Sequence, residues 1–350
     1  MLPLIFSDRL PKANATVVAA DVGGTKVNIA VYQFADGSMK QLNAKQYHTQ
    51  NYSSFTQIAC EFLQEIGSNI KPHCLCAGVA GPVINNRADL VNISWVLTAD
   101  EIAQGTGIKD VLLINDLEAN AYGLACLDKD DICNIYKGNP GIKGNAAIVA
   151  PGTGLGEAGL YWDGTYFHPF ATEGGHCDFS PRTGTDVEIL DYLSKKFDVV
   201  SWERLVSGPG ITSIYSFLKE SGKYKEEQWL QEKFKYEDDS AAISEAAIAG
   251  TSEIAKQTME LFVKYLAREC SNMVLKMKAT GGIYLGGGIP PKIKTLLQSS
   301  AFVEHFLNCD RMQEMLEDVP VNIIMNDKAA LMGAAFYCLS RVTEARAIAS

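Results

Sequence analysis

The sequence predicts an α/β protein made of two domains. A chain of 350 residues is longer than one hydrophobic core usually organises. Short apolar runs with the composition of strands, such as Cys74–Val79, alternate with stretches of helical spacing, such as Phe55–Gly67. One plan, in which a Gly-Thr turn joins two strands, occurs in "AADVGGTKVNIAVY" and again in "VAPGTGLGEAGLY". This repetition predicts two similar halves that each offer a glycine turn to a shared cleft.

The first half of the chain is expected to alternate strands with helices. In order, we expect strands at 16–21 and 27–34, alternating residues near 40–48, a helix at 55–67, a strand at 74–79, a short helix, a strand from 111 and a helix at 117–127. Thr98 and Glu101 form a Thr-x-x-Glu capping box that begins the short helix. The strand from Val111 ends at Asn115 and Asp116, and Asp116 suits the N-cap of the next helix.

A polar, turn-rich stretch, "DKDDICNIYKGNPGIKG", is the best candidate for a domain boundary. Beyond it we expect strands at 145–150, 157–162, 283–285 and 321–325, and helices at 254–277 and 329–339. One stripe of the long helix is apolar and predicts core packing; it comprises Ile254, Thr258, Leu261, Tyr265, Met273 and Met277. The charged run at 219–240 is expected to be a solvated helical face.

The composition is that of a soluble globular protein, with 47% hydrophobic and 21% charged residues. A net charge of −10 gives no reason to expect a nucleic acid or an anionic membrane as a partner. No apolar run has the length of a membrane span, and "LPLIF" near the start is too short for a signal peptide. Nine cysteines without a CxxC pair predict reduced thiols in a cytoplasmic protein.

Three glycine-rich turns follow predicted strands. Residues without a Cβ let backbone N–H groups approach an anion closely, and a threonine adds a hydroxyl donor. A lone Gly-Gly-Thr is more simply a tight hairpin, but three such turns in one chain favour a nucleotide. The residues concerned are Asp21, Gly23, Gly24, Thr25 and Lys26 of "DVGGTK", Gly152, Thr153 and Gly154 of "PGTG", and Gly287 and Gly288 of "GGG". Lys26 adds a cation, and Asp21 adds a carboxylate able to hold a metal-bound water.

Two familiar nucleotide motifs do not fit this chain. No GxxxxGK[ST] sequence occurs, which excludes a Walker-type P-loop. A GxGxxG does occur at Gly154, Gly156 and Gly159, but the hairpin-like stretch "LYWDGTYF" follows it. Because a dinucleotide-binding fingerprint needs a helix at that point, we reject this interpretation.

A set of polar side chains could bind the hydroxyls of a sugar, provided that the fold brings them together. Carboxylates accept from two hydroxyls at once, and amide and imidazole groups add donors. The set is Asn115, Asp116, Glu173, His176 and Glu203. Taken singly, Glu173 is an ordinary surface residue and Glu203 an ordinary helix residue. Zinc at His176 is disfavoured because no second close-spaced Cys/His pair completes such a site.

Together these segments resemble the glucokinases of the bacterial hexokinase-related type. The matching segments, in order, are "DVGGTK", "GPV", "LINDLEANAYGL", "PGTGLG", "TEGGHCDFSP", "ERLVSGPG" and "YLGGGIPP". The resemblance implies a two-domain actin-like, or ribonuclease-H-like, ATPase fold with the active site in the cleft. The first domain would hold residues 14–126 and 328–345, and the second would hold 127–327. A cytoplasmic homodimer is also implied.

The resemblance also implies a role for each candidate residue. Asp116 would be the catalytic base that accepts the proton of the glucose 6-hydroxyl as ATP donates its γ-phosphoryl group, with Mg²⁺. Asn115, Glu173, His176 and Glu203 would hold the sugar hydroxyls. "DVGGTK" and "PGTG" would take the phosphates of ATP, and Gly287 and Gly288 would lie on its adenosine side.

The chain departs from related patterns at two places. The ROK sugar kinases carry a zinc-binding CxCGxxGC segment where this chain has "CDFSPRTG", which points away from that group. Lys26 stands where many of these glucokinases have Asn, so its role stays open. The sequence also leaves open another hexose, such as fructose, mannose or an N-acetylated sugar, another phosphoryl donor, and a sensor without catalysis.

Overall fold

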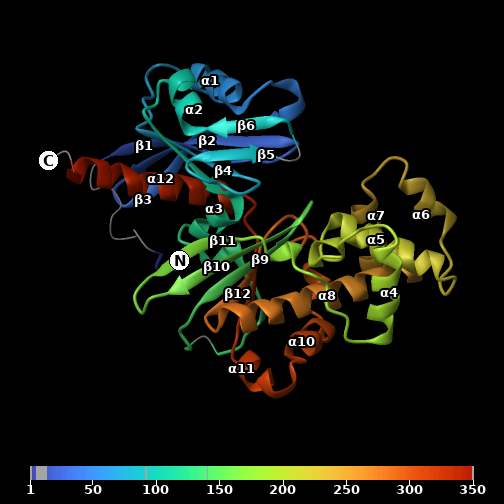
Figure 1. Ribbon diagram of the computed structural model, residues 1–350. Coiled ribbons are helices and arrows are strands. Elements are labelled where there is room, and N and C mark those ends of the chain that lie inside the picture. The colour runs from blue at the N-terminus through green and yellow to red at the C-terminus, as the bar shows by residue number, and fades with distance from the viewer. Residues whose placement is uncertain (1, 5–13, 91–92, 140, 349–350) are drawn as a thin grey trace. The chain divides into compact units, whose positions relative to one another are not determined.

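The computed structural model describes residues 2–4, 14–90, 93–139 and 141–348 and contains two compact units (Figure 1). The first unit comprises Met1–Lys129, Asp163–Ala171 and Asn326–Ser350, and the second comprises Asp130–Trp162 and Thr172–Met325. Both ends of the chain therefore belong to the first unit. The domain ranges implied by the family resemblance stay a prediction.

The first unit contains a five-stranded sheet in the order β3-β2-β1-β4-β7. Its strands are β1 (Ala15–Val22), β2 (Lys26–Ala35), β3 (Ser38–His48), β4 (Cys74–Val79) and β7 (Asp110–Asn115). β1 pairs antiparallel with β2, whereas β1, β4 and β7 run parallel. Parallel strands end at the same edge of a sheet, so Asp21 near the end of β1 and Asn115 at the end of β7 share that edge.

Capped helices flank this sheet. They are α1 (Phe55–Ile66), α2 (Ala99–Thr106), α3 (Asp116–Gly123) and α12 (Ala329–Ile348), and a small hairpin of β5 (Arg87–Leu90) and β6 (Trp95–Thr98) accompanies them. The Ser54 hydroxyl caps α1 by accepting from the N–H of Gln57. The Thr98 hydroxyl likewise accepts from the N–H of Glu101, which confirms the predicted start of α2.

The C-terminal helix α12 packs against α3 and against the sheet strands β1 and β4 (Figure 1). Two glycines make this crossing close. A Cβ on Gly333 would lie 1.8 Å from the carbonyl oxygen of Ala119, and one on Gly123 would lie 2.2 Å from that of Ala329. Side chains at these positions would push the helices apart, so α3 is held by the end of the chain.

A second sheet has six strands in the order β11-β10-β9-β12-β13-β8. The strands are β8 (Ile132–Tyr136), β9 (Ala146–Pro151), β10 (Leu155–Trp162), β11 (Phe167–Thr172), β12 (Gly282–Leu285) and β13 (Val321–Ile324). β9 pairs antiparallel with β10 and parallel with β12. The ends of β9 and β12, which carry two of the glycine turns, therefore lie at one edge.

The second unit is otherwise mostly helical. Its helices are α4 (Gly184–Ser194), α5 (Gly208–Glu220), α6 (Gln228–Lys233), α7 (Asp239–Ile248), α8 (Glu253–Met277), α9 (Lys294–Leu297), α10 (Ser300–Leu307) and α11 (Gln313–Glu317). Ile254, Thr258, Tyr265 and Met273 of α8 are buried in the core, as predicted. Leu261 and Met277 of the same stripe are only partly buried and pack against that core.

Some predicted elements differ from the structure. The stretch predicted as a boundary contains strand β8, whose half-buried residues pair with β13. The run 219–240 is not one helix but the end of α5, a connection, α6 and the start of α7. α3 ends at Gly123, earlier than the predicted Leu127, and α12 extends past the predicted Leu339.

The prediction of reduced cysteines is wrong for one pair. Cys74 of β4 and Cys338 of α12 form a disulfide across 264 residues of sequence. A bond between such distant positions leaves no spacing pattern to read. The remaining cysteines are free thiols. Within the described ranges, no helix is both long and apolar enough to cross a membrane.

Candidate active site

The first glycine turn connects β1 to β2, and hydrogen bonds to its backbone carbonyls hold it in place. The N–H of Gly23 donates to the carbonyl of Lys26 across 3.0 Å. Thr49, which is buried, donates its hydroxyl to the carbonyl of Gly24 across 2.8 Å and its N–H to that of Thr25 across 3.1 Å. The side chains of Thr25 and Lys26 are exposed. The turn is thus fixed by its carbonyls and keeps its exposed side for a ligand.

Asp21 lies at the end of a short chain of polar contacts. Its carboxylate accepts from Asn28 Nδ2 across 3.3 Å, and Asn28 Oδ1 accepts from Gln46 Nε2 across 2.8 Å. Burial raises the pKa of Asp21, and the hydrogen bond from Asn28 opposes that rise. Asp21 also lines a cavity of about 400 Å³ in the first unit, together with Lys45 and Lys328.

Asn115 and Asp116 lie where β7 passes into α3. Asn115 Oδ1 accepts from the N–H groups of Leu117 and Glu118, across 2.8 and 3.3 Å, and Nδ2 donates to the carbonyl of Gly81. Asn115 is therefore the N-cap, and the prediction that Asp116 has this position is wrong by one residue. Asp116 begins the helix half-buried, and its Oδ1 also accepts from Leu117.

The second glycine turn joins β9 to β10. The N–H of Gly152 donates to the carbonyl of Gly154 across 2.8 Å, and the N–H of Gly208 donates to the carbonyl of Gly152 across 2.8 Å. Glu203 contacts the same turn, because its Oε2 accepts from the N–H of Leu155 across 3.0 Å. The Glu203 carboxylate is thus positioned beside Gly154, where an added Cβ would come within 2.5 Å of it.

Glu173 precedes, and His176 ends, a single turn of 3₁₀-helix, Gly174–His176, after β11. The two side chains are exposed, and His176 Nε2 lies 4.0 Å from Glu173 Oε2. The segment that follows pairs with the one that carries Glu203, through Trp202 N–H to the Cys177 carbonyl and Phe179 N–H to the Val200 carbonyl. The fold therefore joins the two segments that the sequence separates.

The third glycine cluster packs against the second turn. Gly287 has a φ of +77°, and a Cβ on it would lie 2.4 Å from the carbonyl oxygen of Pro151. The N–H of Gly286 donates to Val149, and that of Ile289 to Pro151. Only glycine fits at 287, because both its backbone conformation and its contact with β9 exclude a side chain.

The sequence model of the glucokinase family matches residues 18–341. A glucokinase from Nostoc punctiforme is 36% identical over 341 residues, which cover 93% of this chain and 99% of the relative. The crystal structure of a glucokinase from an Antarctic psychrotroph superposes with a TM-score of 0.79 at 29% identity and covers 92% of this chain and 98% of that one. The chain belongs to the glucokinase family.

The fold is the two-domain actin-like ATPase fold of sugar kinases, as predicted. A ROK glucokinase from Streptomyces griseus, solved with glucose and AMPPNP, superposes with a lower TM-score of 0.62 at 18% identity and covers 93% of this chain and 99% of that one. The glucokinase family to which the chain belongs is thus the non-ROK type, in agreement with "CDFSPRTG" at the place of the ROK zinc segment. Among the described residues, no group of three His, Cys, Asp or Glu side chains could hold a metal ion.

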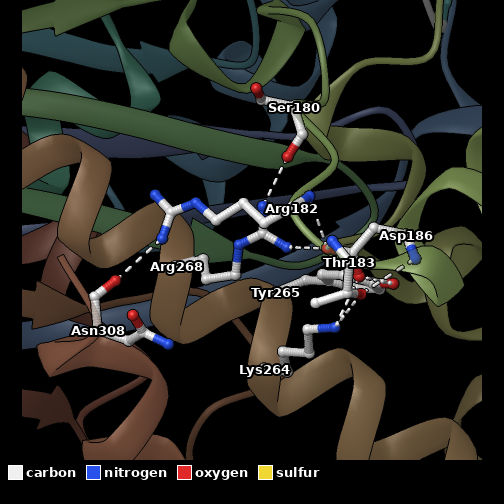
Figure 2. A network of polar contacts seen from close by, with 8 residues as sticks. All are labelled: Ser180, Arg182, Thr183, Asp186, Lys264, Tyr265, Arg268 and Asn308. Atoms are coloured by element: carbon white, nitrogen blue, oxygen red, sulfur yellow. Dashed lines mark hydrogen bonds and ion pairs between the residues drawn. The ribbon is translucent and has the colours of Figure 1, made fainter. Parts of the chain in front are cut away.

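The second unit also contains a buried ionic network, which involves the chain segment that follows His176 (Figure 2). Asp186 of α4 is fully buried and accepts from Lys264 Nζ across 2.6 Å and from Arg268 Nη1 across 2.7 Å. Tyr265 donates its hydroxyl to Asp186 across 3.2 Å, and Arg268 Nη2 donates to the carbonyl of Ser180 across 2.6 Å (Figure 2). The network ties the chain after His176 to helix α8.

Arg268 also touches the segment that carries Glu203. Its guanidinium carbon lies 5.7 Å from the ring centroids of Phe179 and Trp202 and 5.8 Å from that of Tyr265. Such cation–π contacts add attraction to the packing of the side chain. Because Trp202 precedes Glu203 and Phe179 follows the Glu173–His176 loop, one arginine supports both segments from within the core.

Each unit of this glucokinase-family protein holds part of the predicted site. The first unit places Asp21, the Gly23–Lys26 turn, Asn115 and Asp116 at one edge of its sheet. The second unit gathers the Gly152–Gly154 turn, Glu173, His176, Glu203, Gly287 and Gly288. The sequence does not single out four residues that support these groups: Thr49 under the first turn, Asp186 and Arg268 in the buried network, and Glu157 of β10, whose carboxyl lies against Gly174. The Thr183-x-x-Asp186 capping box was the one available signal.

Proposed function

We propose that this chain is a glucokinase that transfers the γ-phosphoryl group of ATP to the 6-hydroxyl of D-glucose, giving glucose 6-phosphate and ADP. Membership of the glucokinase family is the observation that carries the proposal. The sugar and the nucleotide come from the names of related proteins, among them a structure with glucose and AMPPNP. The turns and carboxylates described above suit both ligands.

Asp116 is proposed as the general base. A primary alcohol is a weak nucleophile, and a carboxylate within hydrogen-bond reach takes its proton as the bond to phosphorus forms. Asp116 stands half-buried at the carboxyl end of β7, where α/β sheets bind ligands. Its backbone is fixed because Asn115 caps α3 and α12 packs against that helix.

The sugar is proposed to lie against Asn115, Glu173, His176 and Glu203. Glu173 and His176 are exposed and available to hydroxyls. Glu203 uses one oxygen for the N–H of Leu155 and keeps the other for a ligand. Asn115 Oδ1 already accepts from two backbone N–H groups and Nδ2 donates to Gly81, so its contact with the sugar needs the second hydrogen of its nitrogen.

The phosphates of ATP are proposed to bind at the Gly23–Lys26 and Gly152–Gly154 turns, with Gly287 and Gly288 on the adenosine side. Mg²⁺ usually keeps several waters and needs only one or two carboxylates beside the phosphates, so the single carboxylate of Asp21 fits it. Mg²⁺ would neutralise charge on the phosphates, and Thr25, Thr153 and Lys26 would orient them. Phosphoryl transfer depends mainly on such positioning and charge stabilisation.

The domain ranges 14–126 with 328–345 and 127–327, the homodimer and the cytoplasmic location complete the proposal by family resemblance. The mass of the protein in solution tests the dimer. Cell fractionation tests the location.

Substitution of Asp116 tests the mechanism. Asp116→Ala should lower kcat by a factor of about 10² to 10⁴, the usual effect of losing a general base, while glucose binding largely survives. An assay that couples ADP release to NADH oxidation measures kcat, and Asp110→Ala, at the exposed start of the same strand, is the matched control. Near-normal turnover of folded Asp116→Ala protein would refute the assignment.

A panel of sugars tests the substrate. With ATP and Mg²⁺, D-glucose should give the highest kcat/KM among glucose, fructose, mannose and N-acetylglucosamine. An assay that oxidises the glucose 6-phosphate product with NADP⁺ tests polyphosphate or ADP in place of ATP, because neither of these donors releases ADP. A higher kcat/KM for another hexose would move the assignment to that sugar and leave the kinase activity standing.

A further inference from the structure

Two acidic side chains meet in the interior of the second unit. Glu157 of β10 is 1% exposed, and Glu269 of α8 is fully buried. Glu269 accepts from Asn272 Nδ2 across 2.7 Å and from Lys276 Nζ across 3.4 Å. Neither oxygen of Glu157 accepts a hydrogen bond from any described residue. A buried carboxylate without a donor is costly, whereas a protonated carboxyl can donate to its neighbour.

The Glu157 carboxyl lies directly against the backbone of the Glu173–His176 loop. A Cβ on Gly174 would come within 1.9 Å of Glu157 Oε2, and one on Gly175 within 2.1 Å of the carbonyl oxygen of Leu155. The Thr172 hydroxyl donates to the carbonyl of Glu157 and accepts from the N–H of Gly174. The two glycines of the loop are therefore needed because the loop rests on β10.

Electrostatics favours one shared proton on this pair. Burial and the charge of Glu269 raise the pKa of Glu157 to about 8, and Lys276 opposes that rise. Burial raises the pKa of Glu269 as well. Loss of the proton would leave two buried negative charges in contact, and the repulsion would press the Glu157 carboxyl against Gly174.

We propose that Glu157, protonated and paired with Glu269, is a positioning residue that holds the Glu173–His176 loop in its sugar-binding geometry, and that ionisation of the pair displaces the loop. This inference rests on the proposed role of the loop in binding the sugar. Cys270 and Lys276 of α8 also face the pair, and Glu173 and His176 flank Gly174 at the surface. Lys276 is about half exposed and remains close to Glu269.

The test measures glucose affinity against pH. If only the protonated pair holds the loop, about one tenth of the protein is competent at pH 9, so KM for glucose should rise about tenfold between pH 6.5 and 9. The kcat at saturating glucose should change little. Titration of glucose against the tryptophan fluorescence of the protein, to which Trp202 beside Glu203 contributes, gives the dissociation constant without turnover.

Two substitutions each remove one acid of the Glu157–Glu269 pair and keep the shape of the side chain. Glu157→Gln and Glu269→Gln should each abolish the rise in KM at high pH, because neither pair can become doubly ionised. Glu188→Gln, an exposed residue of α4, is the matched control and should keep the rise. Thermal unfolding shows which variant is folded, and one folded variant is enough.

Three results would overturn the inference. They are a KM for the unsubstituted protein that does not change with pH, a rise in KM that persists in a folded glutamine variant, and a pH effect on kcat alone. A protein that binds glucose with the expected pH dependence but transfers no phosphoryl group would instead overturn the proposed function. The two failures are thus distinguishable.

Discussion

Helix α8 contacts two clusters that each contain a buried acidic side chain. The two clusters offset the cost of burying these acids in opposite ways. At Lys264 and Arg268 it supplies two cations to Asp186, whose carboxylate also accepts from the backbone N–H groups of Arg182 and Thr183. One residue further along, Glu269 faces Glu157, and the cation beside this pair is the half-exposed Lys276, with Asn272 as a neutral donor to Glu269. Buried acids are thus stabilised either by cations and donors or by keeping a proton.

The two clusters should respond to pH in opposite directions. Burial alone would raise the pKa of Asp186, but hydrogen bonds from Lys264, Arg182 and Thr183 outweigh it and hold that pKa below its usual value. Its stabilising effect is therefore present above pH 4 or so and is lost in stronger acid. The raised pKa of Glu157 has the reverse effect, because stability falls as pH rises from about 4.5 to about 8.

Removal of Asp186 should have the largest effect on stability. Asp186→Ala leaves Arg268 buried without its partner and should lower the free energy of unfolding by about 3–5 kcal/mol. Urea denaturation measures the loss. A change below about 1 kcal/mol would show that the buried network contributes no more than a surface pair.

The acidic pair should give a smaller effect that depends on pH. Between about pH 5 and 8, the unsubstituted protein should lose stability relative to Glu157→Gln, by at most about 1.4 kcal/mol for each pH unit, the limit for one proton. Denaturation curves at a series of pH values give this slope. Parallel curves for the two proteins would mean that Glu157 ionises as it does in the unfolded chain.

Removal of Lys264 should lower the free energy of unfolding by less than removal of Asp186. Lys264→Met keeps the Arg268–Asp186 bond and removes one charged hydrogen bond, so we expect about 1–2 kcal/mol. The side chain of Lys264 is 14% exposed, and water can replace part of the contact. A loss as large as that of Asp186→Ala would assign the main compensation to Lys264 and not to Arg268.

A solvent-exposed ion pair should give the smallest effect on stability in this comparison. Lys195 and Asp191 lie one turn apart on α4 and at its end, with both side chains 69% exposed. Lys195→Ala should change stability by at most about 0.5 kcal/mol, and less at high salt. A larger effect would show that the difference between buried and exposed pairs is overstated.

The sequence predicts those elements whose cause is local. β4 lies at the predicted residues, and α1 and α8 differ from prediction by one residue at one end, because apolar periodicity and caps act over a few positions. β8 was missed because its residues are half-buried and become a strand only through pairing with β13. The four-residue strands β5 and β6 are too short to show a period.

The residues of the candidate site also fall into two groups, those that a local motif identifies and those that it does not. Motifs identify the turns and the Glu173–His176 loop, because their glycines and polar groups are adjacent in sequence. The residues that support them are not adjacent: Asp186 and Arg268 are 82 positions apart, and Glu157 and Glu269 are on different elements. Each is an unremarkable charged residue until the fold places its partner beside it.

The position of α12 has a consequence for synthesis of the protein. The ribosome releases the N-terminus first, so β1, β4, β7 and α3 emerge long before the helix that packs against them. The second unit, complete at Met325, can fold while the first still lacks its last element. Asp116 begins α3 and therefore gains this support only after α12 has been made. We expect a ribosome-bound chain to stay inactive until α12 has emerged and packed against α3, so the order of synthesis sets when Asp116 is supported.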